Sequence, residues 1–292
     1  MSAKPLQPNF FHCPLLGRND KKRFREIGIA AAYELAENTQ LEGGPFRWKL
    51  AFDECDLKIY SGRDIGSKYA VITSTPYLST IQVMGTMNEV VDLFRSQTTK
   101  EAKAYCRRFG KVLEDAVNLY SIVPVTPEAP HEMIGISWRA FKPTVGRLVA
   151  RRVACLLEVH HAFEFNGKYV WVRGVKSIVV PCCPELPGFV RMTHHCSGQI
   201  FAESDKPGYI DISSIVIAEA GGSASERCRS LADIDRFLRE DRLSKTPFFK
   251  ADETKPASLA SGCYLCIRRF GLLSKRINCL KCAAVGAFVC GM

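Results

Sequence analysis

The last thirty residues of the chain carry five cysteines in a spacing that suits zinc chemistry. Cys263-x2-Cys266 and Cys279-x2-Cys282 are two pairs twelve residues apart, and Cys290 follows them. A Cys-x2-Cys turn holds two thiolates where one tetrahedral zinc ion takes both, and a second such pair completes a four-sulfur site. The spacing predicts one zinc ion held by the first four cysteines, with Cys290 as a further candidate ligand.

The residues around these cysteines form a basic, partly apolar segment without acidic side chains. Each basic side chain that reaches an anionic membrane surface adds about 1 kcal/mol of attraction. We therefore expect peripheral contact of this segment with anionic, phosphoinositide-containing membranes. The residues expected to make it are Arg268, Arg269, Leu272, Leu273, Lys275, Arg276 and Lys281.

The composition is that of a globular protein with a sizeable core, since 47% of the 292 residues are hydrophobic and 24% are charged. A net charge of +10 favours anionic partners, either phospholipid headgroups or nucleic acid. No apolar run approaches the roughly 18 residues of a membrane span, and the first residues lack the apolar core of a secretory signal. These features predict a cytoplasmic protein with reduced thiols. The scattered cysteines are then expected to be small core or surface residues: Cys13, Cys55, Cys106, Cys155 and Cys228.

Helical spacing of apolar residues predicts an amphipathic helix that starts at Asp20, with Asn19 as its cap. Short strands and a broken helix are expected next, over Trp48–Asp53, Leu57–Tyr60, Thr80–Thr86 and, for the helix, Asn88–Cys106. The period then changes to two. Asn166-Gly167 predicts a two-residue hairpin turn between strands at Ala154–Phe165 and Lys168–Val180, in which Phe165 pairs with Lys168.

The two faces of this hairpin differ in polarity. One face carries Leu157, Val159, Phe163 and Val172, and we expect it to point inward. The other face carries Glu158, His160 and Arg173, for which a solvated cross-strand network is the expectation. If that second face points inward instead, Glu158 and Arg173 become candidates for contact with a ligand.

Two more long strands, Phe189–Glu203 and Tyr209–Ala218, precede an amphipathic helix over Ser225–Arg242. This helix is the expected cover of the apolar face, and a bent sheet closed by one helix can enclose a cavity. Residues 246–262 have the composition of a linker. The residues expected to line the cavity are Leu157, Val159, Phe163, Val172, Met192 and Leu238.

The element order, together with Gly135-Ile-Ser-Trp138 and Pro181-Cys-Cys-Pro-Glu-Leu-Pro187 before a long strand, resembles START-like lipid-transfer domains. The resemblance covers roughly residues 5 to 245. It implies an α+β helix-grip fold, in which a curved antiparallel sheet wraps a C-terminal helix. It also implies that the protein holds one hydrophobic molecule inside without chemistry, and that a charged pair in the cavity can meet the polar end of the ligand.

Cys263-x2-Cys266-x3-Phe270 and the following Cys279-x2-Cys282 resemble the first half of a FYVE-type zinc finger. That family binds two zinc ions with four cysteine pairs in a crossed arrangement and grips phosphatidylinositol 3-phosphate with a basic segment. Here Lys275 and Arg276 match the basic segment, but its two histidines and the fourth cysteine pair are missing. Either the first four cysteines close one site, or the crossed pairing persists with incomplete sites. The resemblance thus implies an incomplete, truncated zinc-finger module.

The sequence predicts a non-enzymatic, monomeric lipid-binding protein with three parts: a START-like domain over 1–245, a linker over 246–262 and the zinc module over 263–292. Peripheral contact with endosomal membranes would follow from the basic module. The alternative is an interaction adaptor whose START-like interior is filled and holds no ligand. An enzyme and a zinc-dependent nucleic-acid binder are weaker alternatives, because no catalytic or nucleic-acid motif is present in the sequence.

Overall fold

The computed structural model describes residues 10–54, 56–66, 75–109, 113–142, 151–219, 228–254, 256–264, 268–271 and 274–287. Its backbone contacts divide the chain into two compact units, Met1–Asp235 and Arg236–Met292. The predicted domain boundaries lie close to this division and stay predictions.

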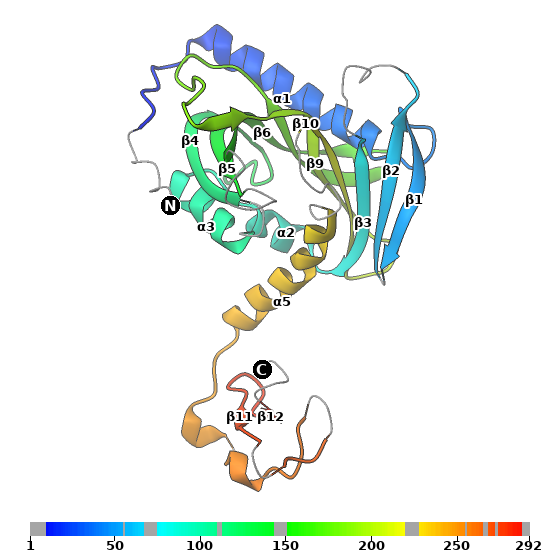
Figure 1. The fold of residues 1–292 in the computed structure, drawn as a ribbon, viewed down its shortest axis with the longest axis vertical. Helices are drawn as coiled ribbons and strands as arrows, with labels where there is room; N and C mark the ends of the chain where they lie inside the picture. Colours follow the sequence, from blue (N-terminus) through cyan, green and yellow to red (C-terminus); the bar gives the residue numbers. More distant parts are fainter. Residues whose placement is uncertain are drawn as a thin grey trace. The chain divides into compact units, whose positions relative to one another are not determined.

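The first unit is built on one large antiparallel sheet that curves around its own interior (Figure 1). Its strand order is β1-β2-β3-β10-β9-β7-β6-β5-β4, and β8 pairs in parallel with β6. The strands are β1 Phe46–Glu54, β2 Leu57–Asp64, β3 Tyr77–Met84, β4 Leu113–Val123, β5 Met133–Phe141, β6 Arg151–Phe165, β7 Lys168–Ser177, β8 Phe189–Arg191, β9 Thr193–Glu203 and β10 Tyr209–Glu219.

The hairpin of β6 and β7 forms as the sequence predicts. Asn166 and Gly167 both take positive φ angles, 52° and 75°, as a two-residue turn between right-twisted strands requires. Phe165 therefore pairs with Lys168, and the same register continues to His160 opposite Arg173. This pairing decides which side chains share a face further along the two strands.

Helix α1, Arg18–Asn38, packs on the face of the sheet that carries Val159 and Val172. Two glycines make this close approach possible. A Cβ at Gly198 would lie 2.6 Å from the Leu35 Cδ1 atom, and one at Gly174 would lie 3.5 Å from it. The sequence predicts the C-terminal helix as the cover of this face. That expectation is wrong, because the N-terminal helix fills the position.

The opposite face of the sheet meets the short helices α2, Met87–Leu93, and α3, Thr99–Arg108. Both begin with a capping box, in which Thr86 pairs with Glu89 and Thr98 with Glu101. The predicted helix is therefore broken where the sequence indicates. The ring of Phe94, which follows α2, packs on Trp171 and Phe201 of the sheet.

The second unit contains most of helix α5, Asp233–Lys245, which follows the 3-10 turn η1, Ser230–Ala232. Two further 3-10 turns, η2 Ala251–Glu253 and η3 Ala257–Leu259, precede a small hairpin of β11, Arg276–Asn278, and β12, Val285–Ala287. Residues of the predicted linker contact this hairpin region, since the Phe249 N–H donates to the Leu280 carbonyl oxygen at 2.7 Å.

Candidate functional site

A buried carboxylate, that of Glu158 on β6, is the centre of a polar cluster inside the first unit. It accepts hydrogen bonds from Arg173 Nη2 at 2.8 Å and from Arg139 Nη2 at 2.7 Å. Ser96 Oγ, from the segment between α2 and α3, donates to it at 3.1 Å, and His160 Nε2 lies 3.3 Å away. All five residues are at least nine-tenths buried.

The strand register places these groups on one face. Glu158 and His160 are two positions apart on β6, Arg173 pairs with His160, and Arg139 on β5 pairs with Ala154. The sequence predicts a solvated network here, and this is wrong. Helix α1 covers the other face, while α2, α3 and the loop between them cover this one, so the cluster lies in the interior. Both faces of the hairpin therefore point into the interior, and contact of Glu158 and Arg173 with a ligand stays a prediction.

The cluster carries more positive than negative charge. Burial acts to raise the pKa of Glu158, but Arg173 and Arg139 overcome it and hold that pKa well below its usual range. Burial lowers the pKa of His160, so this imidazole is neutral at pH 7. The Arg173 guanidinium also lies over the Tyr105 ring, 4.8 Å from the ring centroid. This cation–π contact stabilises part of the positive charge that Glu158 does not balance.

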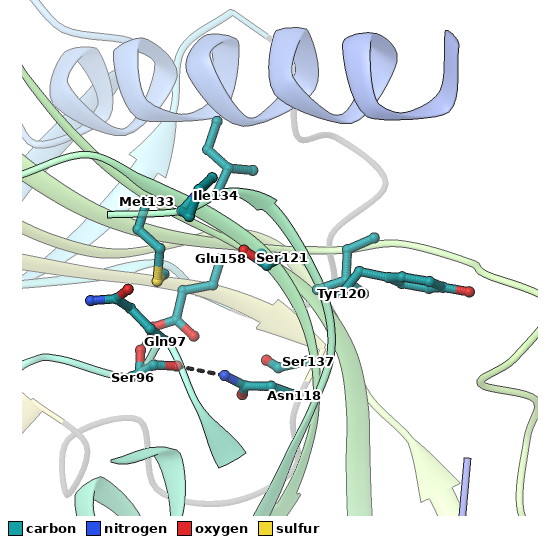
Figure 2. A pocket seen from close by; sticks show the side chains of 12 residues that line it. Ser96, Gln97, Asn118, Tyr120, Ser121, Met133, Ile134, Ser137 and Glu158 are labelled. Carbon is teal, nitrogen blue, oxygen red and sulfur yellow. Dashed lines mark hydrogen bonds between the residues drawn. The ribbon is translucent and has the colours of Figure 1, made fainter. Parts of the chain in front are cut away.

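A small pocket adjoins this cluster, between β4, β5 and the loop after α2 (Figure 2). Its volume of about 20 Å³ holds about one water molecule or one small polar group. Ser96, Asn118, Ser137 and Glu158 line it with polar atoms. Asn118 Nδ2 donates to the Ser96 carbonyl oxygen at 2.6 Å, whereas Asn118 Oδ1 is buried without a hydrogen-bond partner among the described residues.

Two nitrogens in the cluster also lack partners among the described residues, Nη1 of Arg139 and Nε of Arg173. Leaving buried polar atoms unpaired costs roughly 1–3 kcal/mol each. An added hydroxyl or water could satisfy Asn118 Oδ1 from the pocket. The site therefore offers a ligand a polar contact at Asn118 Oδ1.

The six residues predicted to line a cavity do not line this pocket. Leu157, Val159, Phe163 and Val172 belong to the core that α1 packs against. Met192 instead packs with Ala154 and Leu156, which share the Glu158 face, and Leu238 is buried on α5. Their role toward a ligand stays a prediction.

Sequence reasoning missed Arg139, Ser96 and Asn118. Arg139 follows Gly135-Ile-Ser-Trp138 directly, but its neighbour on β6 depends on a strand pairing that no turn motif indicates. Ser96 and Asn118 come from other elements, 62 and 40 positions before Glu158 in the sequence. The grouping of Glu158, His160 and Arg173 was predictable from the sequence, because the Asn-Gly turn fixes the pairing of β6 with β7.

The second Cys-x2-Cys motif lies in the tight turn between β11 and β12. The Cys279 N–H donates to the Ala284 carbonyl oxygen at 2.8 Å, and Ala283 has a positive φ of 56°. The backbone N–H groups of Lys281 and Cys282 point at the Cys279 sulfur and lower its pKa. This turn favours a thiolate, which is the form that binds zinc.

The first motif approaches the same hairpin. The Cys263 N–H donates to the Arg268 carbonyl oxygen at 2.9 Å, and the Tyr264 N–H donates to the Val285 carbonyl oxygen at 2.9 Å. Cys266 and Cys290 lie outside the described residues. Within the described part of the chain, no three His, Cys, Asp or Glu side chains are grouped as a metal site. Zinc binding therefore stays a prediction.

The predicted membrane residues are partly engaged within the second unit. Arg276 donates to the Ser258 carbonyl oxygen at 2.8 Å, and Lys281 donates to the Thr246 carbonyl oxygen. Arg268, Arg269 and Lys275 are exposed, whereas Leu272 and Leu273 lie outside the described residues. Within the described residues, no helix is long and apolar enough to cross a membrane.

The first unit, with its curved antiparallel sheet and few helices, has the START helix-grip fold. The structure is similar to that of human StAR-related lipid transfer protein 5, with a TM-score of 0.60 and 15% sequence identity, over 76% of this chain and 99% of that one. A STAR-related lipid transfer protein from Xanthomonas axonopodis matches with a TM-score of 0.46 and 15% identity, over 66% of this chain and 98% of that one. No protein-family model and no curated protein matches the chain. At these identities the likeness shows the fold alone.

Proposed function

We propose that the first unit binds one hydrophobic molecule, with the polar end of that molecule next to the Glu158 cluster. The observation that carries this proposal is a charged, hydrogen-bonded cluster kept inside the fold beside a pocket with an unpaired acceptor, Asn118 Oδ1. Buried charges are costly unless they are paired, so a lining that retains unpaired polar atoms favours a polar contact from a ligand. The lipid-transfer name of the similar human structure agrees with it.

The proposed role is binding without catalysis. Glu158 accepts bonds from two guanidiniums, and its lowered pKa makes it a weak base. Arg139 also donates to Ser137 Oγ at 3.1 Å, and Arg173 donates to Gln199 Oε1 at 3.3 Å, so both guanidiniums are fixed in position. The apolar part of a bound lipid would gain about 25 cal/mol for each Å² of apolar area it buries.

The small volume of the pocket favours a second candidate. A space of about 20 Å³ does not hold a lipid body, so an interaction adaptor with a filled interior also agrees with the described residues. The two candidates differ in one measurable property, namely whether the purified chain takes up a lipid.

We expect the full chain to extract about one lipid per molecule from mixed vesicles of phosphatidylcholine, phosphatidylserine, ceramide and cholesterol. Replacing Asn118 with leucine fills the pocket and removes its unpaired acceptor, so lipid uptake should fall about tenfold. Native mass spectrometry of the re-isolated protein measures the uptake. Asn88→Leu, at an exposed position on α2, is the matched control and should keep wild-type uptake.

Uptake of no lipid by the wild-type chain would support the adaptor and reject the lipid proposal. Equal losses in Asn118→Leu and Asn88→Leu would show that the pocket is not the site of the polar contact.

We also propose that the second unit binds one zinc ion through Cys263, Cys266, Cys279 and Cys282, and that its basic residues contact anionic membranes from the cytoplasm, including endosomal ones. The turn that presents the Cys279 thiolate supports the first part, and the exposed Arg268 and Arg269 support the second. Zinc would have a structural role here, because so small a segment folds only when it binds its metal ion.

Zinc analysis of the full chain is expected to give one ion per molecule, and Cys279→Ser should lose most of it. Cys228→Ser, a buried cysteine of the first unit, is the control and should keep the ion. A chain purified without zinc, or a Cys279→Ser variant that retains the ion, would contradict the site. Sedimentation with vesicles that contain phosphatidylinositol 3-phosphate then tests membrane contact separately.

A further inference from the structure

Two thiols from distant parts of the first unit meet at its surface. Cys13 Sγ lies 3.2 Å from Cys182 Sγ, although the residues are 169 positions apart in the sequence. Cys13 belongs to the segment before α1, and Cys182 belongs to the turn between β7 and β8. Both side chains are half-buried, so small molecules in solution can reach them. The sequence suggests only a small packing residue for Cys13.

Packing holds both segments in place. Phe11, two residues before Cys13, packs its ring on that of Trp138 at a centroid distance of 5.8 Å. On the other side, the Cys183 N–H donates to the Val180 carbonyl oxygen at 3.0 Å. Arg191 Nη2 donates to the carbonyl oxygens of Cys183 and Pro184, at 2.8 and 2.6 Å. The contact between the two sulfurs is therefore part of the fold.

We propose that Cys13 and Cys182 form a modification site, at which a low-molecular-weight disulfide such as oxidised glutathione converts the two thiols into one disulfide. A protein disulfide has an S–S bond of about 2 Å, so the sulfurs need to approach by only about 1 Å. The bond would join the segment before α1 to the turn before β8.

The disulfide would form in two steps, in which first one cysteine and then the other reacts. The surroundings of Cys13 decide which cysteine reacts first. Burial, together with the adjacent Cys182, raises the pKa of Cys13 to about 12, so Cys13 keeps its proton at neutral pH. Cys182 therefore reacts first. Its thiolate attacks one sulfur of oxidised glutathione, forms a mixed disulfide and releases one glutathione thiolate.

Cys13 then loses its proton and attacks the Cys182 sulfur, which releases the second glutathione thiolate. The two thiol protons end on the two glutathione molecules. In balance, two protein thiols and one oxidised glutathione give one protein disulfide and two reduced glutathiones.

A second pair of cysteines lies nearby and is the natural competitor. The Cys155 thiol, helped by Arg191, lowers the pKa of Cys183 to about 6, so Cys183 is a thiolate near neutral pH. However, Cys183 and Cys155 are 4% and 2% exposed. A glutathione-sized reagent reaches the half-buried Cys182 before it reaches either of them.

The disulfide would close a loop of about 170 residues, which restricts the unfolded chain and raises the unfolding temperature of the first unit. It would also fix the start of α1 against the sheet. In a reducing compartment the pair stays as two thiols, so the bond would report a change in redox conditions.

The test equilibrates the full chain in buffers of fixed ratios of reduced to oxidised glutathione, blocks free thiols and digests the protein with trypsin. Cys182 and Cys183 lie in the same tryptic peptide, between Lys176 and Arg191, so fragment spectra of the cross-linked peptides must assign the bond. We expect a Cys13–Cys182 cross-link in the oxidised samples that disappears on reduction.

Three variants test which cysteines form the cross-link. Cys13→Ser and Cys182→Ser should abolish the cross-link and the rise in unfolding temperature on oxidation, whereas the neighbouring Cys183→Ser should keep both. A cross-link that involves Cys183 in the wild-type chain, or unmodified Cys13 and Cys182 in oxidised glutathione, would overturn the proposal. The wild-type fragment spectra decide this even if one variant folds poorly.

Discussion

Replacing Glu158 with glutamine will lower the free energy of unfolding by about 3–5 kcal/mol, although the two side chains have nearly the same size. The glutamine leaves Arg139 and Arg173 buried without a counter-charge, and both guanidiniums are less than a tenth exposed. Urea unfolding of the full chain, followed by tryptophan fluorescence, measures the change through the transition of the first unit.

The control for this variant is Glu54→Gln. Glu54 also accepts from an arginine, since Arg229 Nη2 lies 2.7 Å from its Oε1, but both side chains are over two-fifths exposed. Exposed ion pairs contribute little, so this variant should unfold almost as the wild type does. Similar losses in the two variants would contradict the buried character of the Glu158 cluster.

The cluster also predicts how the effect depends on pH. The pKa of Glu158 in the folded protein lies well below its ordinary value of 4.5, because Arg173 and Arg139 outweigh burial. A lowered folded-state pKa gives stability that is complete above the unfolded pKa and is lost as the pH falls through the folded one. The difference between wild type and Glu158→Gln should therefore be full at pH 7 and shrink below about pH 4.5.

A variant with apolar residues at all three charged positions separates stability from binding. Glu158→Leu combined with Arg139→Met and Arg173→Met should be nearer to wild-type stability than Glu158→Gln, because no buried charge stays unpaired. If the cluster serves a ligand, this stable variant should still lose lipid uptake. Retained uptake would show that the charges act only in the fold.

The turn chemistry of the chain made part of this site predictable. Asn166-Gly167 fixed the pairing of His160 with Arg173, and so placed Glu158 on the same face as both. The face that points inward was not predictable by polarity, because β6 is buried on both sides from Val153 to His160. When two layers of helices cover a sheet, the more apolar face packs as a solid core and the polar face can still be internal.

Contacts between residues far apart in the sequence were not predictable for a related reason. Arg139 reaches Glu158 through the pairing of β5 with β6, and the nine residues between those strands carry no two-residue turn signal. Cys13 and Cys182 are further apart still, and only tertiary packing brings them together. Local patterns specify elements and neighbouring strands, whereas such contacts depend on how all elements pack.

Replacing Gly198 with alanine will destabilise the first unit by about 3 kcal/mol, because β9 has no space for a Cβ there. The added carbon would lie 2.1 Å from the Arg173 carbonyl oxygen and 2.6 Å from Leu35 Cδ1. Either the pairing of β7 with β9 or the position of α1 on the sheet must shift. Gly66→Ala is the control, since a Cβ at Gly66 meets no atom within 4 Å and should change stability little.

A double variant shows which of the two contacts dominates. Leu35 is fully buried over Gly174 and Gly198, so Leu35→Ala alone should cost about 3 kcal/mol. In the double variant the truncated side chain makes room for the new Cβ, and the combined cost should fall about 1 kcal/mol short of the sum. Strict additivity would mean that the backbone contact with Arg173 alone sets the penalty. In that case the glycine serves the strand pairing that carries Arg173, and only secondarily the docking of α1.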